Sequence, residues 1–207
     1  MNNLQLSEPL EGIEQHVSAV LFDCDGTLVD TMGAHFHSWK NILATQNVER
    51  SLSYDHFCTW GGMAGDLVAR EICTLLEIDR DPEELAQMKR DHFLSQDHDH
   101  PLIIPIVDFA RNVAKTHPVA VVSGGNRQAV EQTLQTAGIR DLFSVVVTPE
   151  DVVHGKPAPD MYLLAAEKLG VKPEECLVLE DGPPGIEAAT SAGMRVVAVG
   201  PAASMMK

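Results

Sequence analysis

The chain has few positive charges for its length. Its 207 residues include 15 Lys and Arg against 30 Asp and Glu, so the formal net charge at pH 7 is -15. A protein that binds nucleic acid or an anionic membrane surface needs a basic face, and we therefore exclude both kinds of partner. The same excess of acidic residues predicts bound cations wherever several carboxylates converge.

Long apolar runs are also lacking. No apolar stretch approaches the ~18 residues that indicate a membrane-spanning helix. The first residues, MNNLQLSEPLEGIEQH, contain no basic region followed by an apolar one, so no signal peptide is expected. We expect a soluble, cytoplasmic protein, and the sequence indicates nothing about its oligomeric state.

Cysteines are few and show no metal-binding or redox spacing. No CxxC pair occurs among the four, which are Cys24, Cys58, Cys73 and Cys176. Each has apolar neighbours, so we expect four small buried side chains. Cys24 lies between two aspartates, but alternation along a strand turns it to the opposite side, which argues against a nucleophilic cysteine.

Five short apolar runs, most of them rich in valine, are present instead. They span residues 17–22, 119–122, 144–147, 176–179 and 195–199. Helical patterns separate the later ones, at 126–138, 159–170 and 185–193. Buried strands alternating with helices predict an α/β fold, a doubly wound parallel sheet with helices on both faces.

Residues 32–100 have a different pattern. They contain no continuous valine run, but helical patterns occur at 34–46, 65–76 and 82–96. We therefore predict an α-helical domain at 32–100, inserted after the first strand of an α/β core formed by 1–31 and 101–207. Asp30 is expected to be a hinge or capping residue, and DHDH at 97–100 a polar loop rather than a metal site.

Polar residues follow the predicted strands. Asp23 and Asp25 come after the first strand, Ser123 and Gly124 after the second, and the segment HGKPAPD after the third; the fourth is followed by Glu180-Asp181. The carboxyl ends of parallel strands share one edge of the sheet, so these groups are expected to converge.

Crowded carboxylates need a compensating cation. Carboxylates ~4–5 Å apart repel by roughly 3–4 kcal/mol per pair at an effective dielectric constant near 20. Oxygen donors alone favour Mg²⁺ over zinc, so we predict Mg²⁺ bound by a set of four residues, Asp23, Asp25, Glu180 and Asp181.

A Mg²⁺ site of this kind commonly also binds a phosphate oxygen. Ser123, the Gly124 amide and Lys156 would complete a phosphate-binding site. Asp23 could then attack phosphorus as a nucleophile, while Asp25 acts as general acid and base. We expect the neighbouring carboxylates to raise the pKa of Asp25, as that role requires.

Together these motifs resemble the haloacid-dehalogenase-like superfamily of phosphotransferases. DCDGT (23–27) is similar to its first motif, and Ser123, Lys156 and Glu180-Asp181 match the other three. HGKPAPD (154–160) and LEDGPPGIEAATSAGM (179–194) resemble its β-phosphoglucomutase-like sugar-phosphatase branch.

The resemblance implies a Rossmann-like core and a helical cap that closes over the substrate. It also implies that Asp23 is the nucleophile, that Asp25 is the acid/base, and that the Asp25 main-chain carbonyl joins Asp23 and Asp181 at the metal, with Glu180 assisting.

Residues of the cap are candidates for substrate contacts. His35, Trp39 and Lys89 lie where related enzymes place substrate-facing groups. Trp39 could equally belong to the core of the cap. Arg127 could reach a second anionic group. The branch carries an arginine in a cap loop, but the corresponding TWGGMAGD (59–66) has Gly65 there and no basic residue. That departure, and the end of the chain at Lys207 soon after the fifth strand, favour hydrolysis over isomerisation.

The sequence therefore predicts a Mg²⁺-dependent phosphatase that hydrolyses a small phosphorylated metabolite, with a sugar phosphate expected, through an aspartyl-phosphate. A β-phosphoglucomutase-type isomerase stays open as the alternative. A phospho-receiver or binding protein without activity is more distant, because receivers lack the helical insert. Dehalogenases generally lack the second aspartate, so Asp25 argues against that activity. Which phosphate ester is the substrate is not readable from the sequence.

Overall fold

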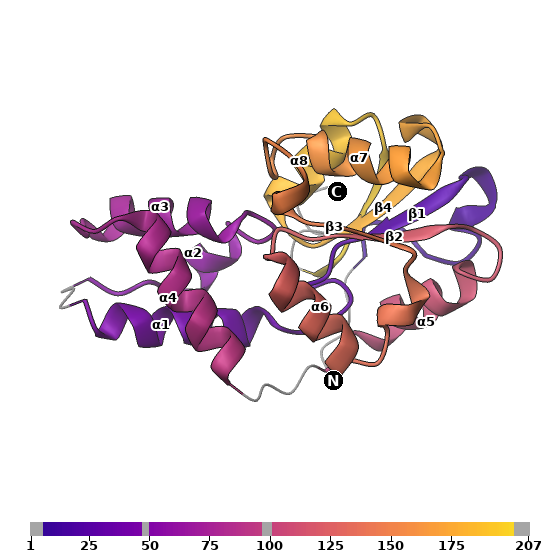
Figure 1. The fold of residues 1–207 in the computed structure, drawn as a ribbon. Helices are drawn as coiled ribbons and strands as arrows, with labels where there is room; N and C mark the ends of the chain where they lie inside the picture. Colours follow the sequence, from indigo (N-terminus) through magenta and orange to yellow (C-terminus); the bar gives the residue numbers. More distant parts are fainter. Residues whose placement is uncertain (1–5, 47–49, 97–100, 201–207) are drawn as a thin grey trace.

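The computed structural model describes residues 6–46, 50–96 and 101–200 (Figure 1). The DHDH segment at 97–100 therefore lies outside the described residues. Within these ranges, no helix combines the length and the apolar character needed to cross a bilayer.

A parallel sheet of five strands forms the centre of the α/β core. Its strands are β1 (Ala19–Phe22), β2 (Val119–Val122), β3 (Val145–Val147), β4 (Cys176–Glu180) and β5 (Arg195–Ala198). Their order across the sheet is β3-β2-β1-β4-β5, and every pairing is parallel. The five predicted strands and the doubly wound topology are confirmed.

Helices cover both faces of this sheet (Figure 1). Helices α5 (Ile104–Val113) and α6 (Arg127–Thr136) lie on one face, and α7 (Asp160–Leu169) and α8 (Pro183–Ser191) lie on the other. Side chains of β1 alternate between them: Val20 and Phe22 pack with α5 and α6, whereas Ala19 and Leu21 pack with α7 and α8. Because both faces are buried, these strands appear in the sequence as unbroken apolar runs.

Four helices lie between β1 and α5 and form a separate unit beside the sheet (Figure 1). They are α1 (Met32–Ala44), α2 (Tyr54–Cys58), α3 (Gly65–Leu76) and α4 (Pro82–Ser95). We call this unit the cap. Its own apolar cluster includes Trp39, Ile72 and Leu85, all buried. Helix α4 starts as the sequence indicates, because the Asp81 side chain accepts a hydrogen bond from the Glu83 N–H.

Short 3₁₀ turns complete the described elements: η1 (Ile13–His16), η2 (Arg140–Leu142), η3 (Pro149–Asp151) and η4 (Pro173–Glu175). Three cysteines are buried as expected, but Cys58 is only half-buried. It ends the short helix α2, in which Phe57 is the buried residue, so the prediction for Cys58 was wrong.

The two connections between cap and core pair with each other. Val29 and Leu102 form an antiparallel bridge, and the Asp30 N–H donates to the Pro101 carbonyl at 2.9 Å. Asp30 thus lies at the junction, as a hinge residue would. Its capping role was wrong, because Thr31 occupies the N-cap position of α1.

A second contact between cap and core is made by backbone alone. A Cβ placed on Gly124 would lie 2.0 Å from the Gly62 carbonyl oxygen, and one on Gly182 would lie 2.2 Å from that of Gly61. Only glycine fits at these two core positions. The cap loop is therefore closed against the carboxyl edge of the sheet.

Candidate active site

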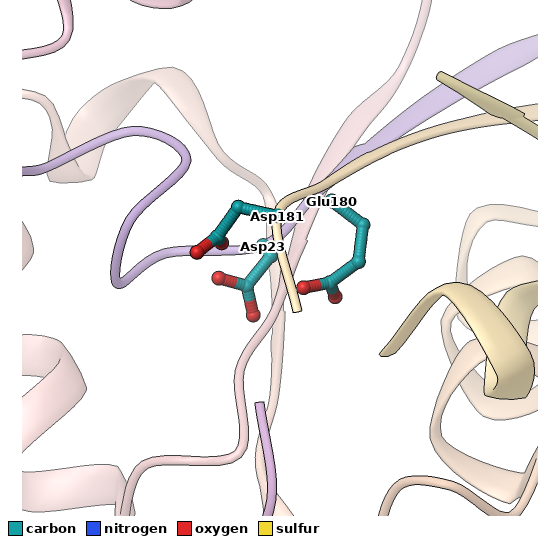
Figure 2. Close-up of side chains that lie close together, drawn as sticks. All are labelled: Asp23, Glu180 and Asp181. Atoms are coloured by element: carbon teal, nitrogen blue, oxygen red, sulfur yellow. The ribbon is translucent and has the colours of Figure 1, made fainter. Parts of the chain in front are cut away.

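Three carboxylates meet at the carboxyl ends of β1 and β4. The Asp23 N–H donates to the Leu179 carbonyl at 3.0 Å, so the parallel register brings Asp23 beside Glu180. Asp23, Glu180 and Asp181 offer oxygen atoms that all lie within 4.8 Å of one another (Figure 2). The convergence expected from the strand ends is present.

Lys156 is buried among these groups. Its Nζ donates to Asp23 Oδ1 at 2.7 Å, to Glu180 Oε2 at 2.6 Å and to the Val122 carbonyl at 2.9 Å. An ammonium has three donors, so all of them are used within the protein. Burial alone would lower the pKa of Lys156, but the charges of Asp23 and Glu180 raise it well above its usual value.

Glu180 is held from further sides. The Tyr162 hydroxyl donates to its Oε2 at 2.7 Å, and the Gly182 N–H donates to its Oε1 at 3.0 Å. The sequence analysis missed Tyr162, which lies on the apolar helix α7 and gives no local sign of contact with β4. Glu180 therefore serves mainly to fix Lys156 and the turn after β4.

One ammonium does not balance three carboxylates. Burial and repulsion from Glu180 raise the pKa of Asp23 well above its usual value, although Lys156 opposes this. The same two causes raise the pKa of Asp181 to about 8, against a hydrogen bond from Thr27 Oγ1 at 2.9 Å. The donors are all hard oxygens in a partly buried cluster, and this set fits Mg²⁺.

Gly26 makes room for this cluster. Its φ is +95°, and a Cβ at this position would lie 2.2 Å from Asp181 Oδ2. A side chain here would therefore displace a carboxylate as well as strain the turn. Gly26 thus lets the chain turn directly after Asp25 while leaving space for Asp181.

Asp25 lies at the boundary between core and cap. Its Oδ1 accepts a hydrogen bond from Thr31 Oγ1 and lies 3.2 Å from His35 Nε2. Burial raises the pKa of Asp25, but the charge of His35 and the hydrogen bonds from His35 and Thr31 outweigh it and lower the pKa to about 2. The expectation of a raised pKa was wrong, because these partners come from residues beyond the motif.

A chain of contacts continues from Asp25 into the cap. Lys89 Nζ on α4 lies 2.5 Å from His35 Nδ1 on α1, and the His35 ring stacks on Phe93 at 4.1 Å. Burial lowers the pKa of Lys89 to about 8, although Asp25 opposes the shift. The structure thus brings His35 and Lys89 together with Asp25, a contact that the sequence analysis did not predict.

A cavity of about 460 Å³ lies between core and cap. From the core it is lined by Asp23, Asp25, Ser123, Gly124, Gly125 and Asn126, and from the cap by residues that include His35, Trp39, Trp60, Met63, Lys89 and Arg90. Trp39 is both a buried member of the cap core and part of this wall. A ligand in the cavity would touch Asp23, Asp25 and the cap at once.

Lys156 and Arg127 are placed differently from the other candidates. Neither is part of the cavity lining among the described residues. Arg127 begins α6 and forms an ion pair with Asp151. Lys156 binds the Asp23 carboxylate without lining the cavity itself. Ser123 is buried and lines the cavity, and its Oγ accepts a hydrogen bond from the Gly125 N–H at 3.1 Å.

Comparisons with known proteins agree with this architecture. A family model described as haloacid dehalogenase-like hydrolase matches residues 17–193. The chain is 33% identical over 189 residues to the fructose-1-phosphate phosphatase YqaB of Escherichia coli, covering 89% of this chain and 97% of that protein. It is 28% identical to the β-phosphoglucomutase of Bacillus subtilis over 92% and 86% of the two chains.

A solved structure shares the fold as well. It is CbbY from Rhodobacter sphaeroides in complex with phosphate, with 25% identity and a TM-score of 0.77 over 87% of this chain and 84% of that chain. The family match spans four of the five strands and the cap helices, and it includes every strand-end group of the site. This chain belongs to the haloacid dehalogenase-like hydrolase family.

Proposed function

We propose that the protein is a Mg²⁺-dependent phosphatase that hydrolyses a small phosphorylated metabolite, a sugar phosphate, through an aspartyl-phosphate on Asp23. The observation that carries this proposal is the joint placement of Asp23 and Asp25 at the cavity, with further carboxylates behind Asp23. The names of relatives support it, since YqaB is a fructose-1-phosphate phosphatase and another is a hexitol phosphatase.

In the first step, a carboxylate oxygen of Asp23 attacks phosphorus. Lys156 holds Asp23 Oδ1 at 2.7 Å and thereby fixes the orientation of the carboxylate. The bond between phosphorus and the ester oxygen breaks, and Ser123 and the Gly124 N–H bind the phosphoryl oxygens. The leaving oxygen takes a proton that the charged His35 ring supplies from Nε2 through Asp25 Oδ1, 3.2 Å away, which leaves His35 neutral and Asp25 ionised.

In the second step, Asp25 acts as a base. With its pKa near 2 it is ionised, so it can accept a proton from a water molecule while the water oxygen attacks phosphorus. The bond between phosphorus and Asp23 breaks, and inorganic phosphate leaves. The lowered pKa keeps Asp25 in the ionised form that this step needs, although it also makes the carboxylate a weaker base.

Asp23, the Asp25 main-chain carbonyl and Asp181 would hold Mg²⁺, with Glu180 assisting through its contacts to Lys156. Bound there, Mg²⁺ would offset the charge of the carboxylates and of the phosphoryl oxygens. The cap at 32–100 excludes bulk water from the cavity and supplies the wall that contacts the leaving group. A cytoplasmic location stays a prediction.

Hydrolysis is favoured over isomerisation by the composition of the cap loop. Residues 60–66 line the cavity and contain no basic side chain. A mutase must hold the second phosphate of a bisphosphate intermediate while it turns over. The cap loop offers no positive charge for that purpose.

The central test is Asp23→Asn. Turnover of a generic aryl phosphate should require Mg²⁺ in the wild type and should be lost in the variant, whose far-UV circular dichroism at 25 °C should still show the wild-type fold. Asp108→Asn, which changes an exposed carboxylate on α5, is the matched control and should keep full activity. Undiminished turnover in Asp23→Asn would refute the aspartyl-phosphate mechanism.

The alternative reaction needs a separate assay. Hexose, pentose and triose phosphates should be compared for phosphate release with and without a bisphosphate activator. Efficient interconversion of glucose 1-phosphate and glucose 6-phosphate, with little release of inorganic phosphate, would establish a mutase instead.

A further inference from the structure

Arg90 is a basic residue of the cavity wall to which neither the motifs nor the proposed mechanism gives a role. It follows Lys89 on α4 and lines the same cavity. Its Nε is buried and has no hydrogen-bond partner. A buried donor without a partner is costly, so its occurrence needs a reason.

A neighbouring side chain fixes the other end of this guanidinium. Arg90 Nη2 donates to Gln87 Oε1 at 2.5 Å, while Gln87 Nε2 donates to Asp91 Oδ1 at 2.7 Å. Because Asp91 engages the amide nitrogen of Gln87, the amide oxygen is the atom that faces Arg90. The guanidinium is thus held at its exposed end and left unpaired at its buried end.

The charge of Arg90 is also unbalanced. Six of the eight arginines form an ion pair with a carboxylate: Arg50, Arg80, Arg111, Arg127, Arg140 and Arg195. Of the remaining two, Arg70 is exposed on α3 and Arg90 is half-buried in the cavity wall. Within the described ranges, Arg90 is the half-buried arginine without an ion pair.

Lys89 increases this imbalance. The adjacent ammonium lines the same wall, and the charge of Arg90 is one cause of the lowered pKa of Lys89, after burial. Two neighbouring cations in a protein with a net charge of -15 leave a local positive region. An anion bound in the cavity beside them would relieve this repulsion.

We propose that Arg90 is a substrate-binding residue that recognises an anionic group, a carboxylate or a second phosphate, at the non-transferred end of the phosphate ester. The inference rests on the proposed phosphatase function. The contacts Asp25–His35–Lys89 lead from the leaving oxygen to α4, so the far end of the substrate lies toward Arg90.

Acidic residues also line the cavity, but they do not replace such a group. Asp66, Glu83 and Glu150 are exposed at its rim, and no ion pair joins any of them to Arg90 among the residues that the structure describes. Water screens these rim carboxylates, so they do not balance the charge of the half-buried Arg90. A neutral hydroxyl on the substrate would also leave this charge unbalanced.

The test uses three six-carbon compounds that all carry the phosphate ester at carbon 6 and differ only at carbon 1. Carbon 1 is a CH₂OH group, a carboxylate or a phosphorylated CH₂OH group. For the wild type, kcat/KM should be about tenfold or more higher for an anionic substrate than for the neutral one. In Arg90→Met this ratio should fall toward one, and in Arg90→Lys it should be partly kept. Arg70→Met, the same change at an exposed arginine outside the cavity, should retain the wild-type ratio.

The outcomes separate the two proposals. Equal or lower kcat/KM for both anionic substrates, or an unchanged ratio in Arg90→Met, would overturn the role of Arg90 while turnover of an aryl phosphate upholds the phosphatase. A preference for only one of the anionic substrates identifies which anion Arg90 binds. Loss of all hydrolysis, the aryl phosphate included, in the folded wild type would refute both proposals.

Discussion

Removing the ammonium of Lys156 tests the energetics of the site most directly. In Lys156→Met, Asp23 and Glu180 lose the donor that lies 2.7 Å and 2.6 Å from their oxygens, and both remain buried. Breaking a buried ion pair by removing one partner costs about 3–5 kcal/mol of unfolding free energy. A chain of this size loses about 2–4 °C in Tm per kcal/mol, so a fall of roughly 6–20 °C is expected without metal.

The assay is thermal unfolding followed by circular dichroism, first in EDTA and then in millimolar Mg²⁺. A divalent cation can replace part of the lost charge at Asp23, so Mg²⁺ should raise the Tm of Lys156→Met more than that of the wild type. Lys172→Met is the matched control, because Lys172 is exposed and lies outside the site. It should unfold like the wild type under both conditions.

Two results would contradict this reasoning. If Lys156→Met and Lys172→Met unfolded at the same temperature in EDTA, Lys156 would not be balancing the buried carboxylates. If Mg²⁺ stabilised the wild type and Lys156→Met equally, the metal would not be reaching the same charges.

Three further predictions concern other parts of the site. Gly26→Ala should lose the rise in Tm on adding Mg²⁺, because its Cβ would lie 2.2 Å from Asp181 Oδ2. Gly138→Ala is the control, with φ +67° and open space around its Cβ; it should be destabilised by backbone strain but keep the rise in Tm with Mg²⁺. Asp181→Asn should raise Tm in EDTA, since it removes one of three crowded carboxylates, and should abolish the rise on adding Mg²⁺; a normal Mg²⁺ response would contradict the assignment. Lys89 has a pKa near 8 in the folded protein, below its usual 10.5, so its stabilising contribution is full above pH 10.5 and is lost as the pH falls through 8. As the pH is lowered from 10.5 to 7, the free energy of unfolding of Lys89→Met, measured by urea unfolding, should therefore rise relative to that of the wild type. A difference that stays constant with pH would refute the shift.

The sheet was predictable because burial on both faces leaves a clear mark on the sequence. All five strands coincide with apolar runs, and the strand-end residues Asp23, Ser123 and Glu180 follow from the topology. Helices α2 and α5 were not predicted. The first has only five residues, too short for a helical period to be visible. The limits of the cap remain a prediction.

The missed features of the site all depend on how separate elements pack against one another. Tyr162 reaches Glu180 from a different element, and the hydrogen bonds of Asp25 depend on how the cap lies on the core. Arg90 belongs to no motif, and its unpaired Nε becomes visible only once α4 is placed against the cavity. A sequence pattern shows which residues are available, but not which partners they are left without.

The junction between cap and core has a consequence for how such an enzyme can change. Asp25 is bound by Thr31 and His35, which lie at the start of α1, directly beyond the paired connections at Val29 and Leu102. A mutation that widens the cap for a new substrate would also move the groups that orient Asp25, the acid/base of the proposed mechanism. Mutations at this junction will therefore change substrate preference and catalytic rate together. A variant selected for a new substrate will also differ in rate.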